Sequence, residues 1–169
     1  MSVSRYLATA LVGTVASTAL LTTSASAAPT SAPASAAATS MQKAVVKLTN
    51  VERRKAGCAA LKPRPALHKA AQRHSADMAE HNFVGHIGSR GSTIVDRVEA
   101  AGYTGWSALA ENVAAGQVTA AGVVKSWMRS PGHRANILNC SLKHIGVGYV
   151  KKSGSADGTY WTQNFGAKF

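Results

Sequence analysis

Two stretches near the end of the chain, HIGVGYV (His144–Val150) and TYWTQNF (Thr159–Phe165), decide the fold class. Both are rich in β-branched and aromatic residues, which favour extended strands. KKSGSADG, residues 151–158, separates them with turn-forming residues, so the pattern predicts an antiparallel hairpin from about Ile145 to Phe165. Helical patterns fill most of the sequence before this hairpin. Helices first and a hairpin last predict an α+β domain, in which helices cover a small antiparallel sheet.

The two longest predicted helices come first. One begins after Ser40, a candidate N-cap, and ends at Gly57. The other covers RPALHKAAQRHSADMAEHN, residues 64–82, where apolar and small residues recur every three or four positions. The small residues on its apolar face indicate close packing against a neighbouring element.

Two shorter helices and one ambiguous segment follow. A third helix is predicted after a cap at Ser92 and stops at Gly102. A fourth is predicted from about Thr119 to Met128. Between them, LAENVAA, residues 109–115, fits either a short strand or a loop.

The first 27 residues are predicted to be a cleaved secretion signal, with a retained membrane anchor as the alternative. Arg5 supplies a positive start, residues 6–21 are an uncharged apolar run that is short for a membrane span, and residues 25–27 fit the small-residue cleavage pattern. Residues 28–40, APTSAPASAAATS, have no charge and no bulky side chain, so we expect a flexible Ala/Ser/Pro-rich linker. The folded domain is then expected over residues 41–169, with no transmembrane segment after removal of the signal.

Cys58 and Cys140 are the two cysteines of the chain. An even number of cysteines in an exported protein favours a disulfide, and one pairing is possible here. Two separate buried thiols are the alternative.

The chain carries a net charge of +12, which falls to +11 when Arg5 leaves with the signal. Its basic residues are scattered rather than interleaved with aromatic residues, and export separates the protein from nucleic acid, so we expect no nucleic-acid partner. The charge suits either a soluble basic surface or adhesion to anionic cell-envelope polymers or lipid head groups.

Two of the six histidines are candidates for function, because each is flanked by glycine in a predicted turn. His86 lies in NFVGHIG and His133 lies in SPGHRAN, and loops carry functional groups more often than element interiors do. Glu111 lies among apolar and small residues, where a carboxylate is expected to be paired or hydrogen-bonded. A packed or solvated role is expected for the other histidines, which are His68, His74, His81 and His144.

His86, Glu111 and His133 follow one another at intervals of 25 and 22 residues, which match no local metal motif. Two neutral imidazoles and one carboxylate can nevertheless hold a zinc ion and leave a fourth position open. Without metal, the same groups would form a hydrogen-bonded network whose histidines titrate near neutral pH. Ser130 lies close before His133 in sequence, but the chain has no G-x-S-x-G nucleophile turn.

Six motifs with a shared resemblance occur in order along the chain. They are HSADMAEHNFVGH (74–86), GSTIVDRVEAAGY (91–103), AENVAAG (110–116), SWMRSPGHRANILNC (126–140), HIGVGY (144–149) and YWTQNFG (160–166). Together they resemble the bacterial branch of the CAP superfamily, which includes cysteine-rich secretory proteins, insect venom antigen 5 and plant pathogenesis-related proteins. The resemblance covers about residues 44–166. It implies a secreted protein with an α-β-α sandwich, in which helices flank a small antiparallel sheet.

The resemblance also implies a central cleft with two histidines and two glutamates, whose histidines bind a divalent metal in some members. By motif, His86 matches the first histidine, Glu111 the glutamate of the EN motif, and His133 the second histidine. Ser130 stands where the second glutamate is expected, so one carboxylate is missing and paired acid–base chemistry is disfavoured.

The preferred functional hypothesis is a secreted, monomeric binding module whose cleft takes a divalent metal such as zinc, a lipid or a cell-envelope ligand. His86 and His133 are then the metal ligands, and Glu111 is a further ligand or an orienting group. Asn112 and Arg134 are expected to support the cleft through hydrogen bonds. The alternatives are a metal-dependent, peptidase-like hydrolase and a structural or interaction domain with a non-functional cleft. The expected location is outside the cell, either free or retained at the cell wall.

Overall fold

The computed structural model describes Met1 and residues 32–169. All of the predicted signal except Met1, that is residues 2–27, and the start of the predicted linker lie outside the described residues. The first helix, α1, spans Ala32–Lys55 and therefore contains Ser40, which was expected to cap it. The prediction of a flexible linker is wrong over residues 32–40, because alanine is the strongest helix former and Ala38 already packs against the hydrophobic core.

The sheet has four strands in the order β1-β3-β4-β2. Their bounds are β1 Lys62–Pro63, β2 Trp106–Ala115, β3 His144–Lys151 and β4 Thr159–Lys168. β3 and β4 form the predicted hairpin, and β2 pairs antiparallel with β4, so residues 109–115 are strand rather than loop. β1 was not predicted, and it pairs parallel with β3. The sheet is therefore mixed rather than wholly antiparallel.

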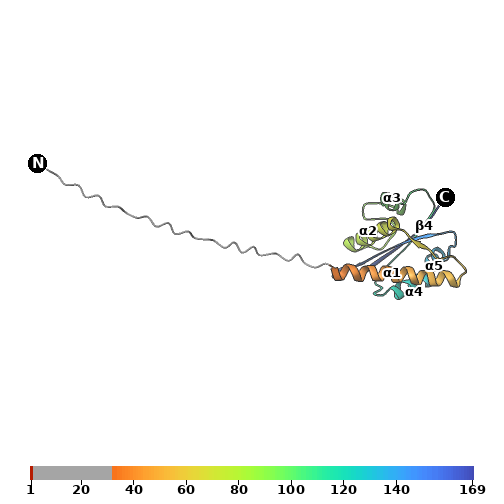
Figure 1. Cartoon of the computed structure of the whole chain (residues 1–169). Coiled ribbons are helices and arrows are strands. Elements are labelled where there is room, and N and C mark those ends of the chain that lie inside the picture. The colour runs from red at the N-terminus through yellow and green to blue at the C-terminus, as the bar shows by residue number, and fades with distance from the viewer. Residues whose placement is uncertain (2–31) are drawn as a thin grey trace. The chain divides into compact units, whose positions relative to one another are not determined.

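Helices cover both faces of this sheet, which confirms the predicted α-β-α sandwich (Figure 1). The bounds of the later helices are α2 Pro65–His81, α3 Ile94–Ala100, α4 Ala120–Arg129 and α5 Pro131–Leu138. Helices α2 and α3 lie on one side of the sheet, and α1, α4 and α5 lie on the other (Figure 1). The N-cap of α3 is Thr93, one residue after the predicted Ser92, because the Thr93 hydroxyl and the Asp96 carboxylate form a reciprocal capping box. Among the described residues, no helix is both long and apolar enough to cross a bilayer.

Helix α5 was expected to be a turn, and that expectation is wrong. SPGHRAN begins a helix because Pro131 occupies its first position, where the fixed φ of proline is favourable and the missing N–H needs no partner. Ser130 ends α4 and precedes α5, so the two helices follow each other without a linker. His133 therefore lies in the first turn of a helix.

The two faces of the sheet differ in side-chain size. Towards α1 and α4, large side chains such as Ile145, Trp161 and Phe165 build the main core together with Trp127 of α4. The indole of Trp127 also donates a hydrogen bond to the Val113 carbonyl of β2, at 3.2 Å. This face contains the largest cluster of buried apolar side chains among the described residues.

Towards α2, β3 presents Gly146 and Gly148, and the helix backbone lies directly against the strand. A Cβ atom at Gly146 would overlap the backbone of Leu67, and one at Gly148 would overlap the backbone of Ala71. The small residues of α2 noted in the sequence thus lie against the glycines of β3. On the neighbouring strand β4, the Thr162 hydroxyl accepts a hydrogen bond from the Ser75 hydroxyl of α2, at 2.9 Å.

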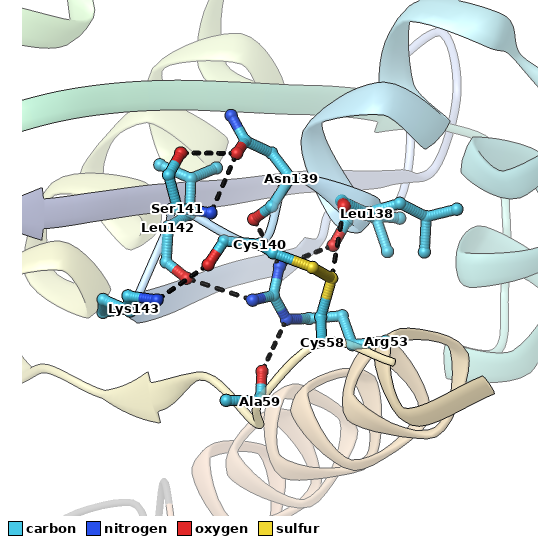
Figure 2. The surroundings of a disulfide bond; sticks show 10 residues. Arg53, Cys58, Ala59, Leu138, Asn139, Cys140, Ser141, Leu142 and Lys143 are labelled. Atoms are coloured by element: carbon cyan, nitrogen blue, oxygen red, sulfur yellow. Dashed lines mark hydrogen bonds between the residues drawn. A yellow bond between two sulfur atoms is a disulfide. The ribbon is translucent and has the colours of Figure 1, made fainter. Parts of the chain in front are cut away.

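The predicted disulfide between Cys58 and Cys140 is confirmed, and it joins the segment after α1 to the segment after α5 (Figure 2). Arg53 of α1 holds the same two segments from the inside. Its guanidinium is fully buried and donates hydrogen bonds to four carbonyl oxygens, those of Ala59, Ile137, Asn139 and Leu142, at 2.8–3.0 Å. The disulfide closes a loop of 82 residues. On the chain-entropy model, such a loop contributes about 4.5 kcal/mol to the free energy of unfolding.

We expect Gly146→Ala to lower the free energy of unfolding by about 2–3 kcal/mol, because the new methyl group meets helix backbone that cannot rotate away. Gly132→Ala is the matched control, since a Cβ there meets no atom within 4 Å and alanine favours the helix. Urea unfolding measures both. Equal stability of the two variants would contradict the proposed backbone contact between α2 and β3.

Candidate functional site

Glu111 is the centre of the candidate site, and both of its carboxylate oxygens are engaged. The residue lies on β2 opposite Asn164 of β4 and is buried. His86 donates its Nδ1 proton to Oε1 at 2.9 Å, and Arg97 donates from Nη2 to Oε2 at 2.8 Å. The Asn164 amide, with its nitrogen turned towards the carboxylate, donates to Oε2 at 3.0 Å. The expectation that this carboxylate would be paired thus agrees with its contacts.

Arg97 of α3 is the charge partner that makes burial of Glu111 tolerable. Its side chain is 8% exposed and that of Glu111 is 3% exposed, so the ion pair is shielded from water. The guanidinium also donates to the carbonyl oxygens of Ser92 and His86, at 2.7 and 3.0 Å. Arg97 therefore fixes the loop that carries His86 as well as the carboxylate. Sequence reasoning missed it, because nothing local connects an arginine in α3 with a glutamate in the next strand.

His74 of α2 lies beside this pair and is fully buried. Its Nε2 donates to the Gly85 carbonyl at 2.8 Å and lies 4.0 Å from Oε1 of Glu111. Burial lowers the pKa of His74, and the charge of Arg97 lowers it further, against the opposing effect of Glu111. The imidazole therefore stays neutral near pH 7 and anchors the start of the His86 loop, which is a packed role of the kind expected from the sequence.

His86 and His133 approach the β2 edge from different layers of the sandwich. The His86 side chain is 58% exposed, and its Nδ1 proton is committed to Glu111. A neutral imidazole in that tautomer carries a lone pair on Nε2. His133 is half-buried, and its pKa is lowered by burial and by the nearby His86. The lowered pKa keeps His133 neutral at pH 7.

Asn112 and Asn136 connect α5 to the strand. Asn112 donates from Nδ2 to the His133 carbonyl at 3.1 Å and to Oε1 of Gln163 at 3.0 Å. Asn136 donates from Nδ2 to Oδ1 of Asn112 at 2.9 Å and to the Glu111 carbonyl at 3.2 Å. Asn112 therefore holds the helix of His133 in place. Asn136 was not anticipated, although it lies one helical turn after His133.

Two residues assigned to the cleft from the sequence have different surroundings. Arg134 was expected to support the cleft, but its side chain is exposed and forms no hydrogen bond to residues 32–169. It points away because it follows His133 by one residue on a helix rather than on a turn. Ser130 is half-buried at the junction of α4 and α5, and its hydroxyl forms no cap to the α5 backbone.

By its chemistry, a pair of imidazoles such as those of His86 and His133 suits a divalent cation, and Glu111 orients the first of them. In the part of the chain from residue 32 onwards, no three His, Cys, Asp or Glu side chains converge on a common metal position. Both oxygens of Glu111 already accept hydrogen bonds, Oε1 from His86 and Oε2 from Arg97 and Asn164. A carboxylate that receives the Nδ1 proton of a metal-binding histidine is a common second layer around zinc.

Comparison with known proteins identifies the family of this chain. Residues 46–165 match the family described as CAP, the cysteine-rich secretory protein family. The chain belongs to the CAP family. Two relatives of the chain are the uncharacterized protein YkwD and the uncharacterized membrane protein YlbC of Bacillus subtilis. They are 42% and 36% identical to it over 124 residues, which are 73% of this chain but 46% and 34% of theirs. The chain thus spans less than half the length of these curated relatives.

A solved structure supports the same assignment. The extracellular protein containing an SCP domain from Bacillus anthracis str. Ames is 28% identical, with a TM-score of 0.70. The match covers 77% of this chain and 41% of that protein. The family and fold expected from the six sequence motifs are therefore confirmed.

We expect Arg97→Met to lower the free energy of unfolding by about 3–5 kcal/mol, because it leaves the buried Glu111 carboxylate without its counter-ion. The double variant Arg97→Met/Glu111→Gln should lose less stability than Arg97→Met, since no unpaired charge remains. Arg134→Met, at an exposed position, should stay within about 0.5 kcal/mol of the wild type. Denaturant unfolding compares the three, and a double variant less stable than Arg97→Met would contradict the charge-pair account.

Proposed function

We propose that this CAP-family chain acts outside the cell as a binding module, and that its cleft takes a divalent cation such as zinc through His86 and His133. The observation that carries the proposal is the hydrogen bond from His86 Nδ1 to the buried Glu111, because it leaves the exposed Nε2 lone pair of His86 available. The lowered pKa of His133 keeps the second imidazole neutral, as a metal ligand must be.

A cation held by two imidazoles would keep open coordination positions. Those positions would accept oxygen donors from water or from an anionic cell-envelope ligand, and the net charge of the exported chain favours its approach to such a surface. We do not extend the proposal to hydrolysis. A general acid or base must exchange a proton with substrate, and both oxygens of Glu111 are already engaged by protein donors.

Zinc titration by calorimetry tests the proposal. Exported wild-type protein should bind zinc, and His86→Ala and His133→Ala should each abolish saturable binding. His68→Ala is the control, because the Nδ1 atom of His68 bonds the Val147 carbonyl away from the cleft. Zinc affinity should decrease as the pH is lowered below about 6.5, because protons then compete with zinc for the imidazole nitrogens.

Circular dichroism must show that each histidine variant is folded. If both cleft variants bind zinc like the wild type, or if the folded wild type binds none, the histidines are structural. The interaction-domain hypothesis then replaces the cation site.

A lipid is the second candidate ligand, and it has a separate place in the fold. A pocket of about 500 Å³ lies between α1, β1, α2 and β3. Val46, Ile145 and Val147 contribute apolar lining, and Lys43 and Arg64 contribute cations. Ligand pockets commonly have this size and a mainly apolar lining with a few polar groups. The combination suits an acyl chain with an anionic head.

Val46→Trp should weaken binding of a fluorescent long-chain fatty acid, because the larger side chain occupies the pocket from its half-buried position on α1. His86→Ala should leave fatty-acid binding unchanged, since His86 is not part of this pocket. Fluorescence titration measures both. Fatty-acid binding that is lost in the His86 variant but kept in the Val46 variant would rule out the α1–β3 pocket.

A further inference from the structure

A polar pocket, separate from the apolar one beside α1, lies between α2, the loop that follows it and α3. Its volume is about 220 Å³, which roughly seven water molecules occupy in liquid water. Its lining includes three arginines, Arg73, Arg90 and Arg97, and two hydroxyl groups, those of Ser89 and Ser92. The size and the lining suit a small oxyanion rather than an apolar ligand.

The charges around this pocket are unbalanced. Its one acidic residue, Asp77, already accepts hydrogen bonds from the Ser89 amide and hydroxyl and pairs with His81 at 3.0 Å. Arg73 and Arg90 form no ion pair and no side-chain hydrogen bond within residues 32–169, and both are exposed. Two guanidinium groups at the mouth of the pocket are therefore available to an anion.

Two residues that line the pocket each carry a buried polar atom that lacks a hydrogen-bond partner among the described residues. They are Nε of Arg97 and Nδ1 of His74, on side chains that are 8% and 0% exposed. A buried polar group without a partner is costly, so a group that satisfies both is favoured in the pocket. Arg97 Nε is a donor. His74 Nδ1 is an acceptor, because Nε2 carries the proton that goes to Gly85.

The loop that carries Arg90 is held in one conformation. The Gly91 amide donates to the Gly88 carbonyl at 2.8 Å, and the Gly88 amide donates to the Ser92 carbonyl at 2.9 Å. A Cβ at Gly88 would overlap the Ser92 hydroxyl, and Gly91 has φ +82°, where side chains are strained. Arg90 thus lies on a tight, fixed turn, which limits the ordering that ligand binding requires.

We propose that this pocket binds a phosphate group in the form that keeps a P–OH proton, with its oxygens facing Arg73, Arg90 and Arg97 and its hydroxyl facing His74. Phosphate offers both acceptors and a donor near pH 7. Sulfate has the same shape but offers acceptors alone. The site should therefore prefer phosphate to sulfate, which attraction to positive charge alone would not produce.

Calorimetric titration of the exported protein with sodium phosphate at pH 7 tests the inference, in buffer with EDTA and with sodium chloride holding the ionic strength constant. Phosphate should bind saturably and raise Tm, and sulfate should bind more weakly. Arg73→Gln and Arg90→Gln should each weaken phosphate binding about tenfold, since each removes a charged donor. Arg129→Gln, an exposed arginine outside the pocket, should change nothing although the net charge falls equally.

Three results would overturn the inference: no saturable binding, equal affinity for sulfate, or wild-type affinity in the Arg73 and Arg90 variants. Glycerol phosphate separates two sources of the same group. If glycerol phosphate binds as tightly as inorganic phosphate, the natural ligand is the terminal phosphate of a larger molecule. If inorganic phosphate binds more tightly, the natural ligand is the free ion. The double variant His86→Ala/His133→Ala should bind phosphate normally, so failure of the cation site and failure of this pocket are distinguishable.

Discussion

The backbone contact between α2 and β3 is the constraint on which the rest of the domain depends. Gly146 and Gly148 let the helix lie directly on the strand, and this places His74 within reach of the neighbouring strands. His74 then holds the Gly85 carbonyl, which starts the loop that carries His86. A side chain at either glycine would push α2 away from β3, and His74 would then lose its hydrogen bond to the Gly85 carbonyl. The candidate site is thus positioned by two residues that have no side chain.

Glu111 lies at the centre of a network of charged and polar groups. The carboxylate is buried, and the arginine beside it compensates its charge while also fixing two loop carbonyls. A carboxylate so fully hydrogen-bonded is well suited to set the tautomer of one histidine and poorly suited to exchange protons with a substrate. Ser130, at the position where a second glutamate was expected, adds no carboxylate. Of the two candidate ligand imidazoles, that of His86 is exposed and that of His133 is half-buried.

The parts of the fold that follow from local patterns were predictable. The hairpin, α2, α4 and the Cys58–Cys140 pairing depend on periodicity, turn residues and cysteine count. Helix α5 was missed because Pro131 and Gly132, which usually mark turns, here begin a short helix. The start of α1 was missed because an Ala-rich segment with no large apolar residue gives a weak helical pattern. Arg97 and Asn136 were missed for another reason: their partners are distant in sequence, and only the tertiary structure brings them to Glu111.

The hydrogen bonds that Trp127 and Asn136 donate to β2 have a consequence for self-association. β2 is an outer strand, and a free strand edge is a template on which another chain can add a strand. The carbonyls of Val113 and Glu111, two residues apart on this strand, are taken by the side chains of α4 and α5. At the opposite side of the sheet, β1 is only two residues long and ends in a proline. Both features reduce the number of backbone groups at the two edges of the sheet with which a strand of another copy could pair.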